Sequence, residues 1–258
     1  MNWYDPDHWS DSQSDFATFC LDYLKNLLKA VEQPELMILA NPRQKFTVPQ
    51  FDQMKLLMQR GTSILVLLNE QGEKGAKSNM NYFLEEFGIS VNSDNVIRTS
   101  FVQVSRSIIS FVRKFQNKQE SWFEVGFQRY YHPKEAVIST PGIISTDICP
   151  PCRFVYPFGA SLNVQSPAVP LLTSSNVCFP VNRPICGFYA AEQPNQGSLA
   201  VLGSIQMFGE NYLQKESNSR IGEALIKLLL SRKALHGRLD MHDANEVPEY
   251  VSGLACRG

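Results

Sequence analysis

Gly203 and Ser204 are the first residues whose types and position could do chemistry. They follow the apolar run Leu199–Leu202 in the string GSLAVLGSIQMF. Ligands and nucleophiles of α/β proteins lie just outside the carboxyl ends of such strands. A nucleophile elbow requires G-x-S-x-G, however, and a phosphate loop requires G-x-x-x-x-G-K-[ST]. Since neither pattern is present here, the pair is interpreted as a strand end that needs small residues.

Cys149 and Cys152 form a C-P-P-C motif, which has the spacing of a redox dithiol. Such a pair needs a helix N-terminus to lower the pKa of its first thiol, and two prolines followed by R-F-V-Y predict no helix. One C-x-x-C pair cannot complete a four-ligand zinc site. The next cysteines, Cys178 and Cys186, are separated by seven residues. We therefore expect ordinary thiols and no metal site.

His132 and Glu135 lie in the string YYHPKEA and could act as a base and the group that orients it. The proline after His132 restricts the histidine to an extended or turn backbone. A base also needs a nucleophile within reach, and the adjacent hydroxyls belong to Tyr130 and Tyr131. A loop that packs aromatic rings and exposes charge is the favoured interpretation.

The remaining carboxylates show no pairing across a cleft, and Glu70, Glu73 and Glu85-Glu86 are interpreted as solvated faces or helix caps. The segment Asn69–Ser78 follows a strand and carries two Gly and two Lys. A ligand loop would lie at this place, but the segment lacks a phosphate-binding pattern. It is interpreted as a flexible loop between a strand and a helix.

The elements that would position these residues alternate between strand and helix. Thr47 and Gln50 have the spacing of a helix capping box, and Gly61 suits the end of the helix that they open. Nearly all-apolar strands between helices favour right-handed βαβ units and a parallel sheet. The expected strands include Glu35–Ala40, Ser63–Leu68 and Leu199–Leu202, and the expected helices include Ser14–Val31 and Ser217–Ser231.

The segment Thr140–Pro184 differs from the rest because it holds eight of the fifteen prolines. Proline is confined to edge strands, strand starts and bulges. The short runs RFVY, ASLNV and VCFPV between the prolines are typical of strands. We expect this segment to add turns and antiparallel edge strands to the sheet.

The composition is that of a globular protein of 258 residues, with 43% hydrophobic and 19% charged residues. A net charge of −1 favours neither nucleic acid nor an anionic membrane as a partner. Met1–Asp15 carries four Asp and no Lys or Arg, which is unlike a secretory or transit peptide. Six cysteines without an export signal indicate a reducing compartment.

Five strings of the chain, taken in order, resemble the intraflagellar transport protein 52 family. They are LMILANPRQKFTVPQFDQMKLLMQRGTSILVLLNEQGE, NMNYFLEEFGISVNSDNVIR, YYHPKEAVIS, FVYPFGASLNVQSPAVPLLTSSNVCFPVNRPICGFY and GSLAVLGSIQMFGENYLQKESNSRI. The resemblance covers most of Glu35–Ile226 and extends weakly to HDANEVPEY. Each string alone is a weak signal, and their common order makes the resemblance specific.

The resemblance implies a GIFT domain. That fold is similar to the flavodoxin-like class I glutamine amidotransferases, with an open sheet and helices on both faces. In those enzymes the nucleophile is a cysteine on a G-x-C-x-G elbow, with a histidine and a glutamate later. None of the six cysteines has these flanks, since Cys186 follows Pro184 and Ile185. The resemblance therefore carries no catalytic, cofactor-binding or metal-binding residue onto this chain.

The resemblance further implies a non-catalytic scaffold subunit of the intraflagellar transport B complex. Its partners would be other subunits of that complex, with no nucleic acid, no membrane and no cofactor. It would work through protein–protein contacts in the assembly and transport of the cilium or flagellum. The expected locations are the cilium, the basal body and the cytoplasm.

The expected domains are 1–34, an N-terminal segment with one amphipathic helix; 35–232, a GIFT-like α/β domain; and 233–258, a polar tail. Thr99–Arg129 is an insertion relative to the family, with five Lys/Arg and two Glu in Phe101–Arg129. It is either a basic surface insertion or translated non-coding sequence. Residues 139–153 are shorter than in the family, and the downstream subunit-binding regions are absent from this sequence.

Two other functions fit the same fold. One is an amidotransferase-like or hydrolase-like enzyme with Ser204 or Cys186 as nucleophile and His132 as base, which rests on analogy of fold alone. The other is a sugar- or metabolite-binding module with contacts at Asn69–Gly75 and Gly203–Gln206.

Overall fold

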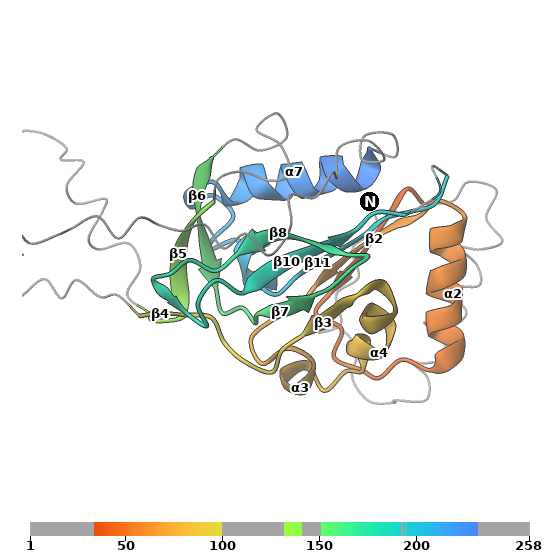
Figure 1. The fold of residues 1–258 in the computed structure, drawn as a ribbon, viewed down its shortest axis with the longest axis horizontal. Helices are drawn as coiled ribbons and strands as arrows, with labels where there is room; N and C mark the ends of the chain where they lie inside the picture. Colours follow the sequence, from red (N-terminus) through yellow and green to blue (C-terminus); the bar gives the residue numbers. More distant parts are fainter. Residues whose placement is uncertain (1–33, 100–131, 141–150, 192, 194, 232–258) are drawn as a thin grey trace, which may run out of the picture.

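The centre of the molecule is a mixed five-stranded sheet (Figure 1). The structure is a computed structural model and describes residues 34–99, 132–140, 151–191, 193 and 195–231. The strands of the sheet, in spatial order, are β1 (Leu36–Ala40), β2 (Ser63–Leu67), β11 (Leu199–Leu202), β10 (Pro184–Tyr189) and β8 (Val169–Thr173).

The parallel part of the sheet consists of β1, β2 and β11. Leu65 of β2 pairs with Ile38 on one side and with Ala200 on the other. Because successive side chains of a strand point to opposite faces, β2 and β11 each supply residues to both faces, and every residue of both strands is buried. This pattern explains why both runs are apolar throughout.

Two hydrophobic clusters cover the two faces. On one face the helix α7 (Asn218–Leu230) packs on Leu65, Leu67 and Leu202. On the other face α2 (Val48–Gln59) and α4 (Met80–Leu84) pack on Ile64 and Val66. Figure 1 shows α7 on one side of the sheet and α2, α3 and α4 around the other. The inward residues of the two long helices are those expected from their spacing: Phe51, Met54, Leu57 and Met58, and Ile221, Ala224, Leu225, Leu228 and Leu229.

The start of α2 has the expected capping box. The Gln50 side-chain oxygen accepts the Thr47 backbone N–H at 2.7 Å and the Thr47 hydroxyl at 3.0 Å. Gly61 follows the helix with φ 102°, a left-handed conformation that glycine adopts at little cost. The local signals in the sequence therefore fix both ends of this helix.

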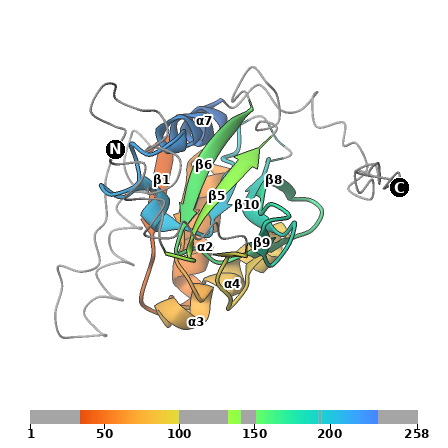
Figure 2. The same ribbon diagram turned by 90° about the vertical axis from the view of Figure 1, so that its left-hand side faces the viewer.

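A separate hairpin of β5 (Glu135–Thr140) and β6 (Cys152–Pro157) lies beside the sheet (Figure 2). Its side chains Ile138, Phe154 and Tyr156 join the same cluster as α7. The remaining elements are short: α3 (Gly72–Ala76), η2 (Glu85–Phe87), β3 (Ile89–Val91), β4 (Ile97–Arg98), β7 (Leu162–Val164), β9 (Cys178–Phe179) and η3 (Ile205–Phe208). Strand β3 pairs with β7 and β4 pairs with β9, both antiparallel.

The first and last described elements meet at the amino edge of the sheet. The Ser63 N–H donates to Glu35 O at 2.9 Å, and the Ser63 hydroxyl donates to Leu229 O near the end of α7 at 2.8 Å. The Ser63 hydroxyl also accepts the Ser198 N–H at 3.1 Å. One serine thus connects the beginning of β1, the beginning of β11 and the end of α7.

The α/β class with helices on both faces is confirmed, but a flavodoxin-like sheet is not supported, because β10 is antiparallel to both β11 and β8. Only nine residues separate Tyr189 from Leu199, and a parallel neighbour needs a longer crossover, usually with a helix. The predicted antiparallel strands in the proline-rich segment are confirmed.

Four other expectations have different outcomes. Glu35–Ala40 forms a strand, but only Ile38 of β1 is fully buried, because β1 lies at the edge of the sheet. Asn69–Ser78 is not a simple loop, since it contains α3. The helix predicted at Ser14–Val31 and nearly all of the insertion Thr99–Arg129 lie outside the described residues.

Candidate functional site

A ligand or catalytic site of this fold class would lie at the carboxyl edge of the parallel strands. At the end of β11, this edge is filled by the protein's own atoms. Ser204 has 0% exposure, and its hydroxyl donates to the Pro157 carbonyl. The next residue, Ile205, begins η3, and its N–H donates to Leu68 O at 2.6 Å. A hydroxyl that is buried and already bonded in this way serves the packing of the strand end.

Gly203 is enclosed by backbone on both sides. Its N–H donates to Ile185 O at 3.1 Å, and its carbonyl accepts the Ala160 N–H at 3.0 Å. A Cβ at this position would overlap the Ala160 carbonyl oxygen and the Tyr156 hydroxyl. The prediction that small residues are needed at this strand end is thus confirmed by the close contacts.

Tyr156 fills the space in front of Gly203. Its ring is fully buried, and its hydroxyl donates to Ala160 O at 2.7 Å. Burial raises the pKa of this phenol well above its ordinary value. A neutral, hydrogen-bonded tyrosine therefore occupies the place next to the strand end.

Cys186, the second nucleophile candidate, lies in the middle of the sheet. It pairs with Leu202 in β11 and with Leu172 in β8, and its side chain has 0% exposure. Burial raises the pKa of the thiol to about 12. The thiolate is the nucleophilic form of cysteine, so Cys186 at neutral pH is an inert core residue.

His132 and Glu135 do not form the pair of a base and its orienting carboxylate. The Glu135 carboxylate accepts the backbone N–H of His132 at 3.2 Å, and it also accepts the Tyr212 hydroxyl. The imidazole Nδ1 accepts the Lys134 N–H at 3.1 Å, and the ring lies 5.2 Å from the Phe158 ring. The interpretation of this string as a loop that packs an aromatic ring and exposes charge is confirmed for His132, whereas Tyr130 and Tyr131 lie outside the described residues.

The same string fastens the β5–β6 hairpin to the rest of the domain. Lys134 forms an ion pair with Glu70, which follows β2. Glu135 and Tyr212 connect the hairpin to the segment before α7, and burial, together with Glu135, raises the pKa of Tyr212. The charged residues of the string therefore have a structural role.

The α3 region provides no phosphate cradle. The Gln71 N–H donates to Asp94 O at 2.9 Å and to Asn95 Oδ1 at 3.1 Å, so it is already bonded within the protein. A Cβ on Gly72 would lie 2.6 Å from Asn92 O. The backbone here approaches Val91 and Asn92 closely, so neither the Gln71 N–H nor Gly72 is available to a bound anion.

Two polar residues at this edge have unpartnered side-chain oxygens; sequence reasoning included Asn69 in a candidate binding segment but missed Asn41. Asn41 follows β1 and Asn69 follows Leu68 at the end of β2, and the side-chain oxygen of each is buried without a partner among the described residues. Buried acceptors of this kind are usually satisfied by ordered water or a ligand. The available signal was an asparagine directly after each of two neighbouring apolar runs, ILA and LVLL.

Metal and membrane sites do not appear in the described part of the chain. Its His, Cys, Asp and Glu side chains form no cluster of three or more that could hold a metal ion. Among its helices, none has the length and apolar character needed to cross a membrane. Cys152 is the first residue of β6, and its C-P-P-C partner Cys149 lies outside the described residues.

Together, the fold and this edge define a mixed-sheet α/β domain in which the space at the end of β11 is filled by the protein itself. A family model described as the IFT52 GIFT domain matches residues 21–108 and 149–245. The chain therefore belongs to the IFT52 GIFT domain family, as the five ordered strings indicated. The unmatched residues 109–148 include much of the predicted insertion and of the shortened region.

Relatives and a solved structure agree with this assignment. The chain is 36% identical over 236 residues to the intraflagellar transport protein 52 homolog of Mus musculus, covering 84% of this chain and 49% of the relative. The chain is also 36% identical over 236 residues to the Homo sapiens homolog, and this match covers 84% of this chain and 48% of the relative. A solved structure titled "mmIFT52 N-terminal domain" matches with 37% identity and a TM-score of 0.64, covering 81% of this chain and 80% of that one. The chain spans about half the length of the curated relatives it matches.

Proposed function

We propose that this chain is a non-catalytic scaffold subunit of the intraflagellar transport B complex. It joins other subunits of that complex through protein–protein contacts and so supports cilium or flagellum assembly and transport. The observation that carries the proposal is the family match over 21–108 and 149–245. The buried Ser204 and Cys186 support it, because an enzyme of this fold class would expose a nucleophile at the carboxyl edge.

Affinity purification of the tagged chain from ciliated cells tests this function. We expect intraflagellar transport B subunits to be enriched over a control that expresses the tag alone. A second control is the variant Leu225→Asp, which places a charge in the buried core under α7 and should lose both fold and partners. Equal recovery of these subunits with the intact chain and with the tag alone would contradict the proposal.

Several finer expectations belong to the same proposal. The chain acts at the cilium, the basal body and the cytoplasm; its folded unit is 35–232; and it uses no cofactor and no catalytic residue. We further propose that the parallel strands β1, β2 and β11 correspond to part of a flavodoxin-like or amidotransferase-like sheet, which the antiparallel strands β10 and β8 extend. Fluorescence microscopy of the tagged chain in ciliated cells tests the locations.

Small-ligand binding is a second candidate, which the unpartnered oxygens of Asn41 and Asn69 favour. A neutral polyol or sugar could donate hydroxyl hydrogens to these oxygens. A thermal-shift screen of neutral sugars tests it, since a ligand that binds only the folded state raises Tm. The variant Asn69→Ala should abolish the shift, and a screen in which no sugar raises Tm would contradict this candidate.

A further inference from the structure

The segment between β2 and α4, residues 69–79, is attached firmly near its two ends and weakly between them. At one end, the Glu70 N–H donates to Phe158 O at 2.8 Å, just beyond the β5–β6 hairpin. At the other end, the Asn79 side chain accepts the Phe46 N–H and donates to Phe46 O, both at 2.7 Å. We call this segment the strap, and it contains α3.

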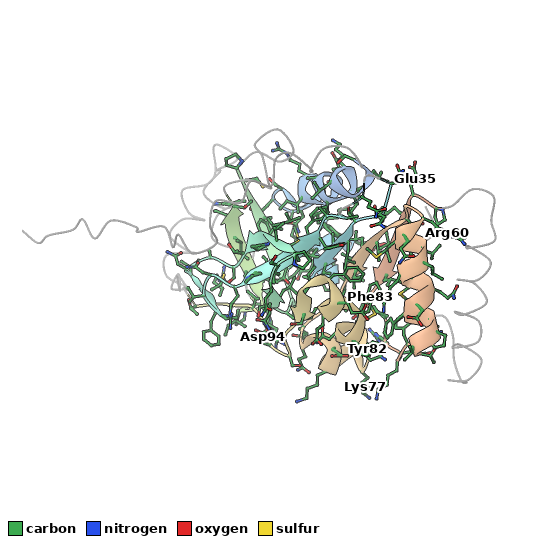
Figure 3. All side chains as sticks on the ribbon, turned by 45° about the vertical axis from the view of Figure 1, so that its right-hand side comes forward. Glu35, Arg60, Lys77, Tyr82, Phe83 and Asp94 are labelled. Carbon is green, nitrogen blue, oxygen red and sulfur yellow. The ribbon has the colours of Figure 1, made fainter. Side chains whose placement is uncertain are left out.

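The backbone of the strap is strained at both ends of α3. Gln71, directly before this helix, has φ 60° and ψ 6°, and Lys77, directly after it, has φ 54° and ψ 29°. A residue with a Cβ adopts this left-handed conformation at a cost that glycine avoids. Figure 3 shows Lys77 at the outer margin of the molecule, whereas Phe83 of α4 lies further inward. Because the Lys77 side chain is exposed, its burial does not compensate for the strain.

Two polar side-chain atoms of the strap are buried without a hydrogen bond. They are Asn69 Oδ1 and Ser78 Oγ, which have no partner among the described residues. Ser78 as a whole is only 6% exposed. A buried polar atom that lacks a partner lowers the stability of the conformation that buries it. Water would satisfy both atoms once the strap moved away from the domain.

The middle of the strap has little buried apolar surface. Its buried residues between Glu70 and Asn79 are Gly72, Ala76 and Ser78, and among these three only Ala76 has an apolar side chain. The middle also bonds to the domain through the Gln71 N–H, which donates to Asp94 O at 2.9 Å. A segment with so few buried apolar contacts opens at a lower free energy than the core does.

We propose that the strap is a local switch, which opens at its middle while the sheet and the two long helices stay folded. The closed state buries Ala76 and keeps the hydrogen bonds of the Gln71 N–H. In the open state, Gln71 and Lys77 leave the left-handed region, and Asn69 Oδ1 and Ser78 Oγ become hydrated. Because each state gains what the other loses, the two states are separated by less free energy than the folded and unfolded domain.

Opening of the strap changes what the carboxyl edge presents to solvent. In the closed state, Gly72 lies directly against the end of β3, since a Cβ on Gly72 would lie 2.6 Å from Asn92 O and 2.8 Å from Val91 Cγ1. Movement of the strap therefore uncovers the end of β3 together with Asn69. The edge then has a covered and an uncovered form. This switch is a property of the domain alone and does not depend on either function proposed above.

Native-state hydrogen exchange of the whole chain, followed by NMR, tests whether the strap opens separately. The amides of Gly75 and Ser78 report on the strap, because they donate to Gln71 O and Glu73 O, each at 3.2 Å. The amide of Leu65, in the middle of the fully buried strand β2, reports on unfolding of the domain. After correction for intrinsic rates, we expect the strap amides to exchange at least about tenfold faster than Leu65. Low urea concentrations should hardly change their rates, since local opening exposes little surface.

Two lysine substitutions form a matched pair that tests the backbone strain. Lys77→Gly should slow exchange of the strap amides roughly fivefold, because glycine keeps the left-handed backbone of the closed state at little cost. Lys74→Gly, at an exposed position within α3, should accelerate exchange, because glycine is a poorer helix former than lysine. Gln71→Gly should act like Lys77→Gly. Ser78→Ala should also slow exchange, because it removes a buried hydroxyl that has no partner among the described residues.

Three results would overturn the proposal. The first is a urea dependence of the Gly75 and Ser78 amides that equals that of the Leu65 amide, since the strap would then open only with the whole domain. The second is an equal effect of Lys77→Gly and Lys74→Gly on the exchange of the strap. The third is faster exchange of the Gly75 amide in the Ser78→Ala protein, because the hydroxyl would then stabilise the closed state.

Discussion

Ser204 and Gly203 owe their residue types to packing. The serine hydroxyl donates to the Pro157 carbonyl, and the glycine lies against Ala160 and Tyr156. A serine at the end of a parallel strand suggests a catalytic nucleophile. The residues beside Ser204 already spoke against that role, because they do not form the G-x-S-x-G pattern of a nucleophile elbow. The structure adds the physical cause, which is the backbone and the phenol that occupy the space a substrate would need.

Gly203→Ala is predicted to lower the free energy of unfolding by about 2–4 kcal/mol, because the added methyl overlaps backbone and a buried ring. Urea denaturation measures this change. Gly209→Ala is the matched control, since the nearest atom to its new Cβ would be Gln206 O at 3.3 Å, and we expect a change of less than about 1 kcal/mol. Equal effects of the two substitutions would refute the packing argument.

Cys186 should make the domain less stable in alkali. Its pKa is raised from 9.0 to about 12 in the folded state by burial. The unfolded chain therefore loses the thiol proton from about pH 9 upward while the folded chain keeps it, so stability is fully present below pH 9 and falls toward pH 12. Tyr156 and Tyr212 have raised pKa values and act in the same direction.

Urea denaturation at pH 8, 9 and 10 measures this slope, and Cys186→Ala should make it shallower. Leu202→Ala, a change at a buried residue that does not titrate, is the control and should lower stability without changing the slope. A Cys186→Ala protein with the slope of the parent would show that the thiol does not contribute.

Helix α7 is connected to its surroundings by Asn218 in its first turn. This fully buried side chain accepts the Val155 N–H at 2.9 Å and donates to Met207 O at 3.2 Å and Tyr212 O at 3.0 Å. It thus binds the hairpin strand β6, the short helix η3 and the segment before α7 together. No pattern in the sequence pointed to this role.

Asn218→Ala should cost about 3 kcal/mol of stability, because three buried groups lose their hydrogen-bond partner. Asn218→Asp should also destabilise, since a carboxylate cannot donate to the two carbonyls. Thermal unfolding measures both effects, and Asn211→Ala, a substitution at an exposed residue, is the control. A Tm for Asn218→Ala within 1 °C of the parent's, a bound set by the usual scaling of Tm with stability, would exclude the predicted role.

Local sequence signals predicted most of the elements but not every strand pairing. The Thr47–Gln50 box, the apolar strands β2 and β11 and the inward face of α7 were all predicted, because each is fixed by residues close in sequence. The antiparallel direction of β10 and the helix α3 were not, because they depend on connection length and on contacts with β3. The ion pair of Lys134 with Glu70 and the hydrogen bond of Glu135 with Tyr212 join residues far apart in the chain, and such contacts produce no periodic pattern in the sequence.

The whole domain should unfold as one unit, since the sheet is shared by both hydrophobic clusters. Leu225→Ala removes packing on one face and Phe83→Ala on the other, and each should cost about 2–5 kcal/mol. Both variants should shift a single transition, with fluorescence and circular dichroism giving the same midpoint. Two separate transitions, one sensitive to each variant, would contradict a single folded unit.

The position of Ser63 has a mechanical consequence for the proposed scaffold function. Because Glu35 and Leu229 both bond to this residue, a pulling force applied between residues 34 and 231 enters and leaves the domain at one corner. The bonds there would open one after another, at low force, while the carboxyl edge carried no load. Surfaces at the far edge would thus keep their shape under tension, as the proposed scaffold function would require.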